Sequence, residues 1–141
     1  MKGLKMKTMM IGLMAALTVS AATPALAKPV AEWVDQTTGH RVLRLTDTPG
    51  SASLYFHQNS YTPQGDKMVI STPDGISVLT LADWSIRPLV KGKDIQLLFT
   101  GRKTRTAYYA SHRRDDGAGA TTLYAADIDS GKVRRIATVD R

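Results

Sequence analysis

The sequence predicts an all-β fold, and three observations support this class. Short runs of β-branched and aromatic residues alternate with turns rich in proline, glycine and aspartate. No segment after residue 30 has the apolar period of a helix. A turn opened by aspartate recurs at Asp35, Asp83 and Asp127, at spacings of 48 and 44 residues. A repeat in the forties favours the blades of a β-propeller, and a complete sandwich of about nine strands is the alternative.

The expected strands group into two four-stranded blades preceded by one extra strand. The extra strand covers residues 41–46, after a turn at Thr38 and Gly39. The first blade has strands at 54–61, 68–71, 76–81 and 86–90, and the second has strands at 95–100, 105–111, 121–127 and 133–138. Because a propeller closes with typically four to eight blades, we expect residues 28–141 to be an incomplete domain that holds the N-terminal blades.

Turn chemistry separates these strands. Pro63 fixes its own φ and Gly65 tolerates a positive φ, so residues 62–66 are predicted to form a turn. Residues 72–75, with the sequence TPDG, have the same chemistry. In the second blade, Gly101 begins the corresponding turn, and a polar loop follows at residues 112–120.

The first 27 residues have the layout of a secretory signal peptide. Three lysines precede an apolar run over residues 9–19, and Ala25-Leu26-Ala27 is a small-x-small cleavage site. We therefore expect a mature chain that starts at Lys28 and is periplasmic or secreted. After cleavage we expect no association with the membrane.

The charge of the mature chain is mildly positive. The full chain has a formal net charge of +7, with 19 Lys and Arg against 12 Asp and Glu. Three of the basic residues lie in the signal region, so the mature chain keeps +4. This excess suits an acidic ligand, but the sequence has no concentrated basic stripe, so nucleic acid is not an expected partner. The chain has no cysteine, which excludes disulfides and thiolate chemistry.

The predicted strand 54–61 carries three consecutive polar residues, beginning with His57, among apolar and aromatic neighbours. Because alternate residues of a strand point to opposite faces, His57 and Asn59 would share a face with Tyr55 and Tyr61. On the innermost strand of a blade, this face lines the channel where propellers bind ligands. His57 and Asn59 are therefore candidate substrate-binding residues for a sugar. A polar channel wall that ties neighbouring blades together is the alternative.

The second candidate is the sequence GRKTR at residues 101–105, which places three cations around a tight turn. Arginine can form a two-pronged hydrogen bond with a carboxylate, so Arg102 and Lys103 are candidate substrate-binding residues for an anionic sugar. A solvated basic turn is the alternative. The corresponding turn of the first blade, TPQGD, lacks the cations, and this difference favours the ligand-binding interpretation.

Four segments of the chain resemble oligogalacturonate lyases of polysaccharide lyase family 22. They are TGHRVLRLTDTPG, LYFHQNSYTPQGDKMVIST, TGRKTRTAYY and LYAADIDSGKVRRI. The resemblance covers nearly all of the mature chain, starting near Glu32. The turn TPQGDKMVI also occurs in TolB-like propeller domains, whereas FHQNSYT and GRKT are more distinctive of the lyases.

The resemblance implies a seven-bladed propeller that cleaves pectin-derived oligogalacturonides by β-elimination. In this chemistry a base removes the proton next to the uronate carboxylate, while a divalent metal, typically manganese, and an arginine neutralise that carboxylate. In the family, the metal ligands and catalytic residues come from later blades. None of them is matched here, because the three histidines lack the spacing of a metal site. The catalytic residues are therefore unknown, and no metal or other cofactor is expected within this chain.

The sequence thus predicts the N-terminal part of an exported oligogalacturonate lyase-like enzyme whose partner is an acidic oligosaccharide. We expect the isolated chain to be inactive. The alternative is a non-catalytic, exported TolB-like propeller module that binds protein or glycan.

Overall fold

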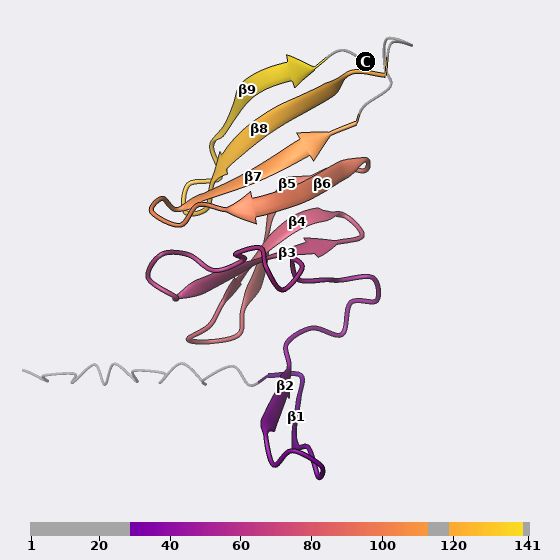
Figure 1. The fold of residues 1–141 in the computed structure, drawn as a ribbon, viewed down its shortest axis with the longest axis vertical. Helices are drawn as coiled ribbons and strands as arrows, with labels where there is room; N and C mark the ends of the chain where they lie inside the picture. The colour runs from indigo at the N-terminus through magenta and orange to yellow at the C-terminus, as the bar shows by residue number, and fades with distance from the viewer. Residues whose placement is uncertain (1–28, 113–118, 140–141) are drawn as a thin grey trace, which may run out of the picture.

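The computed structural model describes residues 29–112 and 119–139, and all regular secondary structure in these residues is β. The strands form three antiparallel sheets, of two, three and four strands, which follow one another along the chain (Figure 1). They are β1 (Ala31–Val34), β2 (Arg41–Arg44), β3 (Lys67–Thr72), β4 (Gly75–Thr80), β5 (Ile86–Lys91), β6 (Ile95–Thr100), β7 (Thr106–Ser111), β8 (Thr121–Asp127) and β9 (Val133–Val139). The all-β class is confirmed. Within the same residues, the chain has no helix that is long and apolar enough to cross a membrane.

The two-stranded sheet is a hairpin of β1 and β2 around a turn that begins at Asp35. The Asp35 carboxylate accepts the amides of Thr37 and Thr38, at 3.0 and 2.8 Å. The Gly39 amide donates to the Asp35 carbonyl at 2.8 Å, and the φ of Gly39 is +70°, a conformation that favours glycine. The predicted extra strand 41–46 corresponds to β2, which ends at Arg44. β1, which was not predicted, pairs with it.

The same turn closes the outer hairpin of the four-stranded sheet, between β8 and β9. The Asp127 carboxylate accepts the amides of Asp129 and Ser130, at 3.2 and 2.7 Å. The Gly131 amide donates to the Asp127 carbonyl at 2.9 Å, and the φ of Gly131 is +72°. The β1–β2 hairpin thus corresponds to the outer two strands of the four-stranded sheet.

The turn at Asp83, predicted as a further copy, is built differently. The Thr80 amide bonds to the Ser85 carbonyl at 2.8 Å, as the Asp127 amide bonds across its own turn to Lys132 at 2.9 Å. Thr80 therefore occupies the position of Asp127. Asp83 lies three residues later, where its carboxylate accepts the Ser85 amide at 3.0 Å. At this turn the sequence comparison therefore aligned Asp83 with Asp127, where the structure aligns Thr80.

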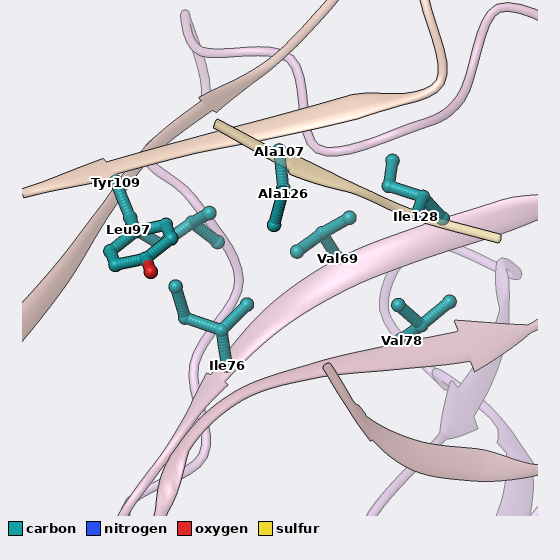
Figure 2. Packing of buried hydrophobic residues seen from close by; sticks show 8 residues of the cluster. All are labelled: Val69, Ile76, Val78, Leu97, Ala107, Tyr109, Ala126 and Ile128. Atoms are coloured by element: carbon teal, nitrogen blue, oxygen red, sulfur yellow. The ribbon is translucent and has the colours of Figure 1, made fainter. Parts of the chain in front are cut away.

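The three-stranded and four-stranded sheets pack against each other through one apolar core (Figure 2). The direct contact between the two sheets is made by β3 and β6. The core consists of Val69, Ile76, Val78, Leu97, Ala107, Tyr109, Ala126 and Ile128. The four-stranded sheet contributes two alanines, Ala107 and Ala126, which are both 0% exposed. Small side chains on one sheet leave space for the branched side chains of the other, so the two sheets can approach closely at interior packing density.

Residues 54–61, predicted as a continuous inner strand, form a loop instead. Only two isolated bridges join this part of the described chain to β3: Ala52 pairs with Ser71, and Tyr61 pairs with Met68. The bridges are nine residues apart on the segment but three residues apart on β3, so the segment holds six more residues than the stretch of β3 that it spans. The three-stranded sheet therefore has two isolated bridges in place of the fourth strand that was predicted to complete the blade.

The looped-out segment, residues 53–60, has a physical reason to leave the sheet. The Gln58 amide donates to the Tyr55 carbonyl at 2.8 Å, which closes a turn inside the excursion. Consecutive polar side chains at residues 57–59 would need partners on both faces of a packed strand, whereas a loop keeps them hydrated. The strand prediction was wrong because it weighed the aromatic residues of this segment above its polar ones.

We expect Ala126→Leu to lower the free energy of unfolding by about 1–3 kcal/mol, because added methylene groups have no space at the contact between the sheets. The matched control is Ala137→Leu on β9, where the alanine is exposed, and a change within about 0.5 kcal/mol is expected. Urea-induced unfolding followed by circular dichroism measures both. Equal effects at the two alanines would contradict close packing at Ala126.

Candidate functional site

The loop 53–60 presents three neighbouring rings at the surface. The ring centroids of Tyr55 and Phe56 are 4.5 Å apart, and the His57 ring lies 5.1 Å from Tyr55 and 5.4 Å from Phe56. The side chains of Tyr55 and Phe56 are exposed, with Phe56 at 86%. Clustered exposed rings are typical of surfaces that bind a ligand or a partner, because covering them removes apolar area from water.

An open depression of about 530 Å³ adjoins these rings. It is lined by Phe56, His57, Gln58, Asn59, Tyr61, Thr62, Pro63 and Arg102. Three of the four residues predicted to bind substrate, His57, Asn59 and Arg102, are thus brought together. The fourth, Lys103, is exposed on the same turn as Arg102 but is not among the lining residues.

Asn59 holds the base of the loop against the four-stranded sheet. Its Nδ2 donates to the Tyr61 carbonyl at 2.7 Å and reaches the Thr100 carbonyl at 3.4 Å. Its Oδ1 accepts the Tyr61 amide at 3.3 Å, and its carbonyl accepts the Thr100 amide at 2.9 Å. Because these bonds occupy the amide group, Asn59 positions the depression. Direct contact of Asn59 with a sugar stays a prediction.

Arg102 and Lys103 lie on the turn between β6 and β7. Gly101 begins this turn, and a Cβ there would lie 2.2 Å from the Oγ1 of Thr104. The position therefore requires glycine, since a side chain would force the turn open. The tight turn fixes the backbone from which the exposed Arg102 side chain reaches the depression.

The third cation of this sequence, Arg105, joins the two larger sheets. Its guanidinium bonds Asp66 at 2.7 and 2.9 Å and Asp129 at 2.5 and 3.0 Å. Gln64 accepts a further bond at 2.6 Å, and Lys67 Nζ donates to Asp129 at 2.5 Å. Because Asp66 leads into β3 and Asp129 follows β8, the cluster connects the three-stranded sheet to the four-stranded sheet. Arg105 therefore has a structural role.

Hydrogen bonds within this cluster shift the pKa values of its charged side chains. The Arg105 guanidinium, and then the Thr62 hydroxyl, hold the pKa of Asp66 well below its ordinary value of 3.8. Arg105, and then Lys67, do the same for the pKa of Asp129. The two carboxylates in turn raise the pKa of Arg105 above its usual value, with Asp129 the larger cause. All three groups are therefore charged near neutral pH.

Phe56 is the main lining residue that sequence reasoning missed. Strand alternation placed it on the face opposite His57, and the turn inside the loop brings both to one depression. The signal that could have found it is the run of three polar residues itself, which favours a loop with no fixed alternation.

The described residues also bear on a metal site. In residues 29–112 and 119–139, no group of three or more His, Asp or Glu side chains is arranged to hold a metal ion. The described residues therefore offer no ligand set for manganese, which the resemblance places in later blades. Comparison of the chain with protein-family models, with curated proteins and with solved structures finds no match.

We expect Arg105→Gln to destabilise the protein more at pH 6 than at pH 3. Folding lowers the pKa of Asp66 and Asp129, so their contribution to stability is present above about pH 4 and is lost as the pH falls toward their folded pKa values. Without Arg105 the larger part of this pH dependence is lost, while the smaller contributions of Thr62 and Lys67 remain. Urea midpoints of the wild type and the variant at both pH values measure the difference.

The matched control for this measurement is Arg102→Gln, since no ion pair within residues 29–112 and 119–139 involves Arg102. It is expected to have little effect on stability at either pH. A loss of stability in Arg105→Gln that is the same at pH 6 and pH 3 would contradict the proposed coupling to the two carboxylates.

Proposed function

We propose that the chain supplies the first blades of an exported β-propeller of the oligogalacturonate lyase type, and that its depression binds the uronate of an acidic oligosaccharide. The observation that carries this proposal is the convergence of His57 and Arg102. They are 45 residues apart in the sequence and line one depression together with the exposed Phe56 ring. A cation, polar groups and an aromatic face are the features by which proteins hold an acidic sugar.

The repeated build of the two larger sheets supports the propeller. The Thr62 amide bonds the Lys67 carbonyl at 3.0 Å, and the counterpart bond in the next sheet joins Gly101 and Thr106 at 2.8 Å. Aligned on these bonds, β3, β4 and β5 match β7, β8 and β9 in order and direction. The sheets contact each other through β3 and β6, close to the inner edges of the two proposed blades. Successive blades of a propeller have this relation.

Four of the lining residues have a proposed role in binding. The Arg102 guanidinium forms a two-pronged bond with the sugar carboxylate. Phe56 offers its ring face to the C–H face of the sugar, and the His57 ring donates or accepts a hydrogen bond with a hydroxyl group. The bonds that Asn59 makes to Tyr61 and Thr100 hold the loop in place during binding.

The proposed role of these residues is binding and orientation of the substrate. Manganese, when bound by a lyase of this type, neutralises the uronate carboxylate and so makes the neighbouring proton more acidic. Because the described residues do not assemble ligands for that ion, no chemical step of the elimination is assigned to them.

The alternative function is a non-catalytic, exported TolB-like module that binds glycan or protein. The exposed rings of Tyr55 and Phe56 favour this alternative as much as they favour an enzyme, because stacking needs no catalytic group. The two proposals differ in turnover. A lyase releases an unsaturated sugar that absorbs ultraviolet light, whereas a binding module leaves the oligosaccharide intact.

We expect Arg102→Gln to weaken the binding of trigalacturonate roughly tenfold or more, because a hydrogen bond to a charged group contributes about 1.5–3 kcal/mol and ~1.4 kcal/mol is tenfold. His57→Ala is expected to weaken binding by a few-fold up to about tenfold, as for a neutral hydrogen bond. Isothermal titration calorimetry measures the affinity. Because this chain alone is expected to be inactive, the ultraviolet absorbance of the unsaturated product is recorded with the complete propeller, where it separates the lyase from the binding module.

Lys103→Gln is the matched control, because it removes the same charge from the same turn at a residue outside the lining. Its expected effect is small. Equal losses in Arg102→Gln and Lys103→Gln would show that only the general charge of the turn matters. Wild-type affinity in both Arg102→Gln and His57→Ala would rule out the depression as a uronate site.

A further inference from the structure

A second hollow, of about 980 Å³, lies at the other end of the four-stranded sheet. β6 ends at Thr100 beside the depression and begins at Ile95, which lines this hollow. We call it the β5–β6 groove. It is lined by Val90, Lys91, Gly92, Lys93, Asp94, Ile95, Tyr109, Ser111, Ala120, Thr122, Tyr124, Arg135 and Thr138. The groove and the depression therefore occupy opposite ends of β6, and the order of the strands can be followed in Figure 1.

One wall of the groove is a row of side chains across β7, β8 and β9. Tyr109 pairs with Tyr124, and Tyr124 pairs with Arg135, so the three side chains lie on one face of the sheet. The two tyrosine rings are stacked, with centroids 5.2 Å apart and planes 14° apart. Tyr109 is buried in the core (Figure 2), Tyr124 is half-buried and Arg135 is exposed. The row therefore leads from the core into the open groove.

A second row, of hydroxyl groups, runs beside the first. Ser111 pairs with Thr122, and Thr122 pairs with Thr138. The hydroxyls of Thr122 and Thr138 are 3.3 Å apart and bond to each other. Ser111 and Thr122 are each two residues from a tyrosine of the first row, so the alternation of the strands keeps both rows on the groove face. The wall thus combines an aromatic surface with hydroxyl donors and acceptors.

The charge of the groove is predominantly positive. Lys91 is the last residue of β5, Lys93 lies in the connection between β5 and β6, and Arg135 comes from β9. All three are exposed, and none takes part in an ion pair within residues 29–112 and 119–139. Asp94 is the one acidic residue among the lining residues. Three cations held around one hollow attract an anion.

The backbone that carries the lysines is fixed on both sides. The Gly92 amide donates to the Asp74 carbonyl at 3.0 Å, and the Asp94 carbonyl accepts the His112 amide at 2.9 Å. Lys91 also pairs with Gly75 in the three-stranded sheet. The connection therefore presents its cations from a fixed position, which reduces the ordering cost of binding.

We propose that the β5–β6 groove is a second binding site for an acidic oligosaccharide, separate from the depression. Tyr124 provides the stacking face for a sugar ring, the hydroxyl row bonds the sugar hydroxyls, and Arg135 with the two lysines binds the carboxylates. This inference goes beyond the proposed function, because it assigns the chain two sites at opposite ends of β6, each of which binds its own oligosaccharide.

The test is an NMR titration of the protein with tetragalacturonate, in which the amide signals of Tyr124 and Thr138 report the groove. We expect these signals to shift in the wild type and the apparent affinity to fall about tenfold in Arg135→Gln. Arg134→Gln is the matched control, because it removes the same charge from the preceding residue of β9. Arg134 pairs with Ala125 and so faces the other side of the sheet. It is expected to keep the wild-type affinity at the groove.

Two further titrations, one with a neutral ligand and one with a variant of the depression, separate the possible outcomes. Methyl-esterified tetragalacturonate, which lacks the charges, is expected to bind the groove at least tenfold more weakly. His57→Ala alters the depression and is expected to leave the groove titration unchanged, so failure of the depression and failure of the groove are distinguishable. The proposal is overturned if the groove signals do not shift with tetragalacturonate, if Arg134→Gln and Arg135→Gln lose affinity equally, or if the neutral ester binds as tightly as the acid.

Discussion

The close contact between the three-stranded and four-stranded sheets is the constraint on which the rest of the structure depends. Ala107 and Ala126 leave space for Val69 and its neighbours, so β6 can lie against β3. That contact brings the Thr100 amide to the Asn59 carbonyl and so fixes the base of the loop 53–60. At the other end of the same sheets, side chains become progressively exposed from Tyr109 toward β9, and the β5–β6 groove opens there. One interface thus positions both proposed binding sites.

Two arginines of the turn between β6 and β7 have different roles: Arg105 is structural, and Arg102 is proposed to bind the ligand. Arg105 is engaged by two carboxylates from the two sheets, which reinforces the apolar contact. With the side chains of Asp66 and Asp129 more than a third exposed, solvent screens these pairs, and their main effect is to fix the geometry of the interface. Arg102, three residues earlier, is left at the exposed tip, where it lines the depression. Neighbouring cations of the same turn therefore have different tasks because only one of them faces the other sheet.

The strands after residue 66 could be predicted from the sequence to within one residue at each end, because turns that contain glycine, proline or aspartate separate them. The predicted strands 95–100 and 121–127, for instance, are β6 and β8. Strand β1 was missed because it has only four residues, of which Ala31 and Glu32 are poor strand formers. The ion pair of Glu32 with Arg41 at 2.5 Å exists only in the folded hairpin. The segment 54–61 was assigned the wrong structure because its pairing depends on β3, which local propensity does not reveal. His57 and Arg102 could be selected as polar and basic residues in unusual places, but their convergence with Phe56 depends on the packing of the sheets.

Amide hydrogen exchange of the native protein tests most directly whether the two larger sheets form one cooperative unit that positions the sites. The informative amides are those of Val69, which bonds Ser60, of Thr100, which bonds Asn59 across the interface, and of Ile128, which bonds Arg105. We expect all three to exchange through the same opening, with one free energy, and to respond equally to added urea. Rapid exchange at Thr100 while Val69 and Ile128 stay protected, or different opening free energies for Val69 and Ile128, would show that the sheets open separately and that their contact does not hold the sites.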